Sequence, residues 1–242
     1  MKIHSVFSKI AILLVSISLV ACNGFRNDNI VIQGQLNQNI FSKIYLFKTT
    51  FEGNFLLDST EIHQGKFSFK IKNSATYPEF YQISLSPINQ MAIIAKQGDR
   101  LQITADANHL AKSYTIEGSD DAKLMHQLDR MLTQLMDTLE VLYSIYEKNI
   151  ENDVIRASVD FQYISLLSQY NADLIRFIKK NSSSMVSIPA FYQTCNRRKI
   201  LEEKENLDLL QLIYHDLKEK YPNSGDVKFL KNRIDQHSTT QQ

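Results

Sequence analysis

The pattern of apolar residues changes abruptly at Gly118, and this change constrains the fold more than any other feature of the sequence. Before Gly118, apolar and polar residues alternate with a period of two, as in strands with one buried and one solvated face. After it, apolar residues recur every three or four positions, as on one face of an α-helix. We therefore predict an α+β protein in which an N-terminal antiparallel β-sandwich or barrel is followed by a C-terminal helical bundle.

The region 30–118 is predicted to form the β domain, because short β-rich runs are separated there by Gly, Asn and Pro. The clearest run is 66–71, where Phe and Ile alternate with Lys and Ser. His63-Gln64-Gly65 predicts a tight hairpin turn between this run and the one before it, and Gln97-Gly98-Asp99 predicts a second hairpin turn. The predicted strands are residues 30–35, 43–48, 55–62, 66–71, 79–85, 91–96, 101–105 and 114–117.

The region 119–236 is predicted to form the helical domain. Two long amphipathic helices, over about 120–146 and 155–178, are separated by a short polar break and should pack as an antiparallel hairpin. Shorter helices are expected from Ser187, over 207–221 and over 226–236, with Ser119 and Ser224 as N-caps. Residues 237–242 are expected to form a disordered tail. Since the hinge at Gly118 is short, the first helix should pack against the sandwich.

The N-terminal segment predicts export. Two lysines precede an apolar run over residues 10–20, which is shorter than the 20 or so residues that span a bilayer, so residues 1–21 are interpreted as a signal peptide. Leu19-Val-Ala-Cys22 resembles a bacterial lipobox, and this resemblance implies cleavage before Cys22 and acylation of that residue. The alternative is an ordinary secretory signal with an incidental cysteine. Residues 22–29 would then form a tether, with the lipid bilayer as partner through acylated Cys22.

The expected location is the cell envelope, with a lipid anchor in the outer membrane facing the periplasm, since Asn23-Gly-Phe-Arg26 lacks the acidic residues of surface-exported lipoproteins. Without the two signal lysines, 25 Lys and Arg stand against 26 Asp and Glu, a net charge of −1. The compact basic cluster Arg197-Arg198-Lys199 is followed at once by three glutamates. No nucleic-acid partner is therefore expected.

Catalytic chemistry is not predicted. With Cys22 acylated, Cys195 is the remaining thiol, and its aromatic neighbours in a predicted helix favour a buried core residue over a nucleophile. Neither a catalytic set nor a cofactor-binding motif is recognisable, and no metal site is expected because the six histidines are scattered. They are His4, His63, His109, His126, His215 and His237.

Two further sets of residues have alternative interpretations. His126 and Asp129 lie three apart on the first long helix, and we interpret them as a surface pair rather than as a site. Four tyrosines at helical spacing could line a groove for a ligand or peptide, although packing between helices is the more common role of such residues. They are Tyr143, Tyr146, Tyr163 and Tyr170.

Four turn and strand motifs, taken in order, resemble a known family: Asp58-Ser-Thr60, Gly65-Lys-Phe-Ser-Phe69, Gly98-Asp99 and Glu117-Gly-Ser119. The family is the N-terminal domain of unknown function 4369 of exported lipoproteins of Bacteroidota. In these lipoproteins a helical region and a thioredoxin-like thiol-disulfide oxidoreductase domain usually follow. The segments 177–184 and 221–224 resemble the helical region. The sequence has no Cys-x-x-Cys, so we assign the oxidoreductase activity of these lipoproteins to no residue of this sequence.

Three functions are therefore considered. The preferred one is a membrane-anchored envelope lipoprotein that acts as a non-catalytic binding or scaffold module, with an envelope protein as partner. The alternative is an accessory subunit of a separately encoded thioredoxin-like oxidoreductase. The third is an enzyme with an unrecognised site.

Overall fold

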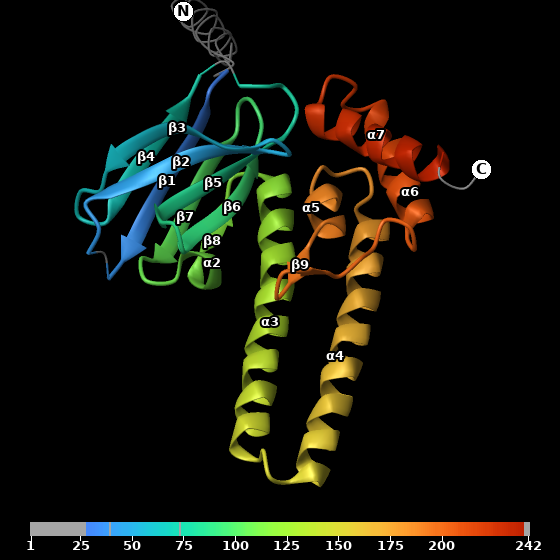
Figure 1. The fold of residues 1–242 in the computed structure, drawn as a ribbon. Coiled ribbons are helices and arrows are strands. Elements are labelled where there is room, and N and C mark those ends of the chain that lie inside the picture. Colours follow the sequence, from blue (N-terminus) through green and yellow to red (C-terminus); the bar gives the residue numbers. More distant parts are fainter. Residues whose placement is uncertain (1–27, 39, 73, 240–242) are drawn as a thin grey trace, which may run out of the picture.

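The computed structural model describes residues 28–38, 40–72 and 74–239. The predicted signal peptide, Cys22 and most of the tether lie outside the described residues. Two four-stranded sheets are followed by helices, two of which form a long hairpin that extends from the rest of the molecule (Figure 1). The predicted α+β class, with an N-terminal β domain and C-terminal helices, is confirmed.

Two sheets enclose the core of the β domain. One has the order β4 (Lys66–Ile71), β1 (Ile30–Asn37), β7 (Arg100–Asp106) and β8 (Thr115–Glu117). The other has the order β3 (Gly53–Glu61), β2 (Lys43–Thr50), β5 (Glu79–Ser86) and β6 (Asn89–Ala95). Apolar side chains from both sheets form one buried cluster. All eight predicted strands are present. Seven of them contribute buried side chains to this shared core, whereas the edge strand β3 is held by its pairing with β2 and has no buried side chain.

Both predicted turns form, but neither joins paired strands. Backbone hydrogen bonds between His63 and Lys66 close a turn over Gln64 and Gly65, both of which have positive φ. The chain then changes sheet, so β3 pairs with β2 while β4 pairs with β1. The same occurs at Gly98, where β6 and β7 belong to different sheets. The predicted hairpins are therefore wrong, and β1 and β7 pair in parallel within the otherwise antiparallel sheets.

The helices follow the predicted order. They are α2 (Leu110–Ser113), α3 (Asp120–Lys148), α4 (Asp153–Lys180), α5 (Ser187–Phe191), α6 (Leu207–Lys218) and α7 (Gly225–Thr239). The short α2 was not predicted. Asn152 caps α4 by accepting hydrogen bonds from two backbone amides, whereas the buried hydroxyls of Ser119 and Ser224 have no partner within the described residues. Ser119 occupies the N-cap position of α3, as predicted, but its side chain makes no capping hydrogen bond. The predicted disordered tail is wrong for residues 237–239, which belong to α7.

The β domain and the helices share their cores. Helix α3 packs against β6 and β8, which confirms the predicted contact with the sandwich. Ala122 of α3 belongs to the β core, and Ile94 of β6 belongs to the helical core. Gly118 has φ +103°, and a Cβ there would lie 1.8 Å from the carbonyl oxygen of Arg100. Only glycine can make this close connection.

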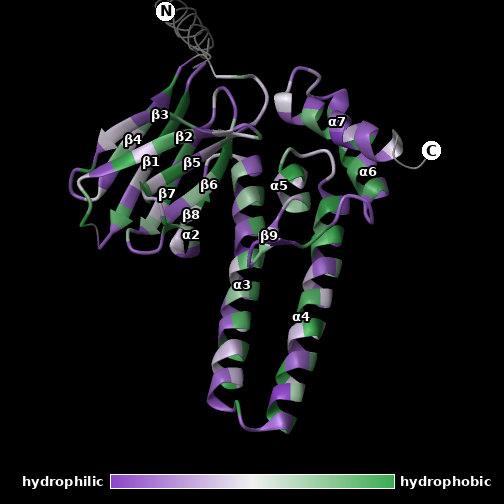
Figure 2. Cartoon of the chain, viewed as in Figure 1, coloured by the Kyte–Doolittle hydropathy of each residue, from purple (hydrophilic) through white to green (hydrophobic). Residues whose placement is uncertain are grey.

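Hydrophobic and hydrophilic residues alternate along α3 and α4 (Figure 2). Among the described residues, no helix has the length and hydropathy needed to cross a membrane.

Candidate binding groove on the helical hairpin

The α3–α4 hairpin is covered by other elements at one end and open at the other. In its inner half, Leu128 and Leu135 of α3 and Leu174 and Phe177 of α4 lie in the helical core with α5 and α6. Farther out, the two helices contact each other through Leu139, Leu142 and Val159. Two helices can bury only the stripe that each turns toward the other. Apolar residues outside that stripe therefore remain on the surface.

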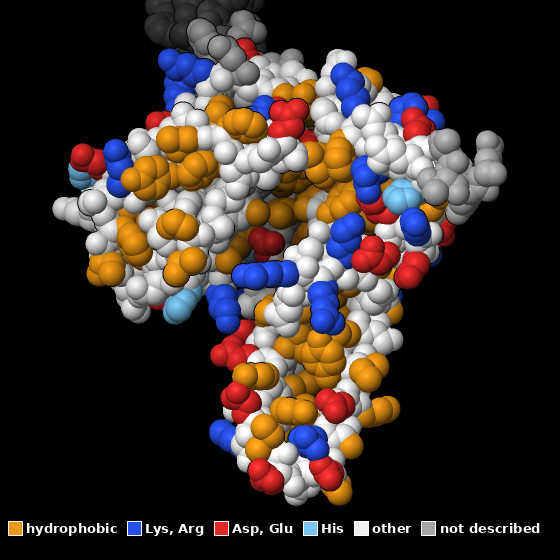
Figure 3. Space-filling model, in the orientation of Figure 1, with side chains coloured by type: hydrophobic (Ala, Val, Ile, Leu, Met, Phe, Trp, Pro, Cys, Tyr) orange, Lys and Arg blue, Asp and Glu red, His pale blue; other side chains and the backbone are white. Residues whose placement is uncertain are grey.

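Some of these apolar residues form a groove between the two helices, with a volume of about 620 Å³. Hydrophobic side chains gather along the hairpin between α3 and α4 in the space-filling view (Figure 3). Tyr143 is 62% exposed and Tyr163 is 39% exposed, although both are large aromatic residues. The groove is lined by Ala111, Lys112, Leu132, Thr133, Met136, Leu139, Glu140, Leu142, Tyr143, Tyr146, Val159, Asp160, Tyr163 and Asn196.

Three of the four tyrosines proposed for a groove lie there. Tyr143, Tyr146 and Tyr163 line the groove. Packing between α3 and α4 is therefore not the sole role of these three side chains. Tyr170 is buried and its hydroxyl lies 2.5 Å from Oε1 of Gln193, so for this residue the packing interpretation is right. The helical spacing identified the set, but only the depth of each residue along the hairpin separates the exposed tyrosines from the buried one.

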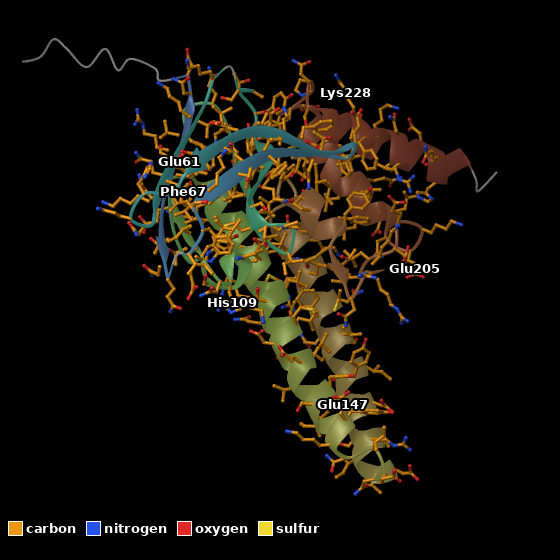
Figure 4. The ribbon with its side chains drawn as sticks, turned by 60° about the vertical axis from the view of Figure 1, so that its left-hand side comes forward. Glu61, Phe67, His109, Glu147, Glu205 and Lys228 are labelled. Atoms are coloured by element: carbon orange, nitrogen blue, oxygen red, sulfur yellow. The ribbon has the colours of Figure 1, made fainter. Side chains whose placement is uncertain are left out.

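Carboxylates surround the outer half of the groove. Glu140 and Asp160 line it. The hydroxyl of Tyr143 donates a hydrogen bond to Glu147, which lies on the outer part of the hairpin in Figure 4. Asp153 pairs with Arg156 at the start of α4. Residues 137–160 contain six carboxylates and two cations, a net charge of −4. The outer half of the groove is therefore apolar along its floor and acidic around its rim.

The inner end of the groove has the opposite charge. Strands β9 (Thr194–Cys195) and β10 (Arg198–Lys199) pair across a turn at Asn196 and Arg197, both with positive φ. Asn196 lines the groove and also a second hollow of about 850 Å³, which Arg198 and Lys199 line. Tyr163 lines both hollows, so they adjoin one another. The basic cluster Arg197-Arg198-Lys199 therefore borders the groove through Arg198 and Lys199.

His126 and Asp129 do not form the predicted surface pair. The hydroxyl of Tyr114 donates a 2.5 Å hydrogen bond to Oδ2 of Asp129. The ring of His126 packs edge-on against that of Tyr114, at 4.6 Å between centroids. Burial raises the pKa of Asp129 to about 6, although the hydrogen bond from Tyr114 opposes this shift. Sequence spacing missed this cluster because Tyr114 comes from outside α3.

Cys195 is buried, as predicted, but it lies in β9 rather than in a helix. Its Sγ is 3.6 Å from Sδ of Met136, and burial raises the pKa of the thiol. A buried thiol with a raised pKa carries little thiolate at neutral pH. The predicted helix ends at Phe191, and the chain then forms the β9–β10 hairpin, whose turn has positive φ at Asn196 and Arg197.

A charged cluster around Glu203 was not predicted. Glu203 is 4% exposed and accepts hydrogen bonds from Arg233 and from the hydroxyl of Tyr192. A ring nitrogen of His237 lies 2.8 Å from the same carboxylate. Hydrogen bonding to Arg233 is the main cause that lowers the pKa of Glu203 to about 2. The cluster joins α7 to the segment before α6. We interpret it as structural.

Among the described residues, no group of three or more His, Cys, Asp or Glu side chains is arranged to hold a metal ion.

Residues 30–125 match the model of a family described as Domain of unknown function (DUF4369). The matched stretch contains the whole β-sandwich and the first turns of α3, which supports the resemblance predicted for the β domain. Most residues of the groove follow the matched stretch. No curated protein and no solved structure matches the chain.

Proposed function

We propose that this protein is a membrane-anchored lipoprotein of the cell envelope that acts as a non-catalytic binding or scaffold module. We further propose that a protein partner binds in the groove between α3 and α4. The observation that carries this proposal is the gathering of exposed apolar side chains in one groove with a charged rim.

The chemistry of the groove favours a protein segment over a small polar ligand. Tyr143, Tyr146 and Tyr163 offer broad apolar surfaces with polar ends, a combination enriched at protein interfaces. A helix could lay an apolar stripe along the floor, as in other helix-in-groove complexes. The carboxylates of Glu140 and Asp160 would then select charge on the partner and fix its orientation.

The placement of the groove suits an anchored protein. Strand β1 begins at the end of the molecule opposite to the tip of the hairpin (Figure 1). A tether that leads into β1 from Cys22 therefore leaves the groove uncovered. Residues 23–29 reach about 25 Å at most when extended, so the β domain would stay close to the lipid surface.

Site-specific photocross-linking in living cells tests the binding proposal. A photoreactive amino acid at position 163 should give a discrete cross-linked protein, identified by mass spectrometry. The same amino acid at position 88 is the matched control, because Ile88 is an exposed apolar residue in the turn between β5 and β6. Equal cross-linking at the two positions, or none at either, would count against a partner in the groove.

The anchor is tested by Cys22→Ser. This variant should lose palmitate labelling and move from the membrane fraction to the soluble fraction, because acylation supplies the membrane affinity. Cys195→Ser is the control and should keep the label. Protease treatment of intact cells then tests the proposed periplasmic side of the outer membrane, where the protein should be protected. Palmitate incorporation that survives Cys22→Ser would contradict the proposed anchor.

A further inference from the structure

The charge along the groove reverses sign from one end to the other. At the outer end lies the acidic tip, which we define as Glu147, Glu151 and Asp153. At the inner end lies the basic turn, which we define as Arg197, Arg198 and Lys199. All six residues are exposed, but Asp153 pairs with Arg156 and Lys199 lies 4.0 Å from Glu202, so Glu147, Glu151, Arg197 and Arg198 are the charges that the proposal uses. A surface of this kind is complementary to a copy of itself that is turned end over end.

The spacing of the two charged clusters sets the register of such a pair. Asn196, which directly precedes the basic turn, lines the groove together with Met136, and the tip loop begins at Asn149. About 13 residues of α3, or about 20 Å of helix, separate these levels. Two hairpins that lie antiparallel with a two-fold axis near Tyr143 bring each acidic tip to the other copy's basic turn. A two-fold interface requires this self-complementarity.

We propose, building on the proposed binding function, that the occupant of the groove is the same groove of a second copy. The two α3–α4 hairpins pack face to face and antiparallel as a four-helix bundle. Tyr143 and Tyr163 of each copy bury their exposed rings at the centre. The acidic tip of each copy contacts the basic turn of the other at both ends of the interface.

The exposed area fits this assembly. The large, partly exposed apolar and aromatic side chains that line the two hollows are Leu132, Met136, Tyr143, Tyr146, Tyr163, Leu167, Ile175 and Ile200. Together they offer on the order of 400 Å² of apolar surface. A standard interface buries about 800 Å² on each partner, a little more than half of it apolar. The charged rim supplies the remainder.

Charge also decides the direction of packing. A parallel pair of hairpins would place the two acidic tips together, and like charges in contact oppose association. The antiparallel pair removes this repulsion. It is compatible with two lipid anchors in one bilayer, since a two-fold axis normal to the membrane places both N-terminal segments at the same height.

The test is a charge-swap experiment on the full chain in mild detergent, with sedimentation velocity over about 1 to 100 µM protein. The tip variant is Glu147→Lys with Glu151→Lys, and the turn variant is Arg197→Glu with Arg198→Glu. The wild type should dimerise. Each variant alone should have a dissociation constant at least about tenfold higher, because tip and turn then carry the same sign.

Two restorations separate lost complementarity from damage to the fold. The tip and turn variants mixed in equal amounts should form a heterodimer, and one chain that carries all four substitutions should dimerise again. Wild type that stays monomeric throughout, or dimers unaffected by either variant, would overturn the proposal. A monomeric chain that cross-links from position 163 to a different protein would also overturn it, while leaving the proposed binding function intact.

Discussion

The β domain and the outer half of the hairpin differ in how they cover similar residues. In the sandwich, each sheet buries the apolar face of the other, and residues such as Ile32, Ile44 and Leu101 have no exposed surface. In the hairpin, each helix has a single partner, and Phe161 and Ile164 are mostly exposed. A layer needs a second layer over its whole apolar face. The comparison therefore indicates that the sandwich core is closed between its two sheets, whereas the edge strand β3 and the outer half of the hairpin leave large apolar side chains such as Leu56 and Ile164 on the surface.

The largest expected effect comes from one substitution made in both regions. Ile44→Ala removes a fully buried side chain and should lower the free energy of unfolding by about 2–5 kcal/mol, because it leaves a cavity in the sandwich. Ile164→Ala should change it by less than about 0.5 kcal/mol, because Ile164 is 67% exposed. Urea titration of the monomeric protein measures both. Similar losses of unfolding free energy in Ile44→Ala and Ile164→Ala would contradict the difference in burial between the sandwich and the hairpin.

A pair of glycines tests how tightly the two regions are joined. Gly118→Ala should lower the free energy of unfolding by about 2–4 kcal/mol, since it combines a positive φ with a collision against the backbone of Arg100. Gly225→Ala meets no atom within 4 Å and lies at the start of α7, so it should be neutral or stabilise by up to about 1 kcal/mol. Thermal unfolding of both variants gives the comparison. A harmless Gly118→Ala would show that the junction can relax.

The half-buried carboxylate of Asp129 should make stability depend on pH. Its folded pKa, about 6, lies above the ordinary value of 3.8 for an aspartate, so the native state binds more protons than the unfolded state between about pH 4 and 6. Stability from this group is therefore lost as the pH rises through that window, about 3 kcal/mol in all.

Asp129→Asn should remove this loss and be more stable than the wild type above pH 6, because the amide keeps an oxygen that can accept from Tyr114. Asp137→Asn on the exposed side of the same helix is the control. Its pH profile should follow that of the wild type within about 1 kcal/mol. Chemical unfolding from pH 4 to 8 measures the three profiles. A parallel profile for Asp129→Asn would contradict the burial of the charge.

The smallest effect on stability, and a clear chemical contrast, concerns thiols. Cys195 in the covered half should react with an alkylating reagent about 100-fold more slowly than in the unfolded chain, because it is buried and its pKa is raised. Ile164→Cys in a Cys195→Ala background should react at nearly the rate of a free thiol. Mass spectrometry of timed samples measures both rates. Rapid alkylation of Cys195 would instead favour a redox role for this chain, which insulin reduction beside Cys195→Ala would then check.

For the groove, the sequence predicted the parts but not the site. Helical spacing identified the hairpin and its tyrosines, and the break at residues 149–153 located the tip. The sequence showed Arg197-Arg198-Lys199 as a compact basic cluster but did not place it beside the hairpin. It became part of the groove because β9 and β10 fold back beside α3 and α4. Contacts of this kind join residues far apart in the sequence, and no local period encodes them.

What the sequence determined by itself was local: the strand faces, the two long helices and the turns at Gly65 and Gly98. Each depends on backbone conformation or on a repeat of two or 3.6 residues, which neighbouring residues suffice to define. The tertiary structure decided which strands pair, including the parallel β1 and β7, that Tyr170 is buried, and that Asp129 is half-buried beside Tyr114. These outcomes depend on the free energy of closing two sheets and two helices over one another, and that free energy belongs to the assembled fold rather than to any single segment.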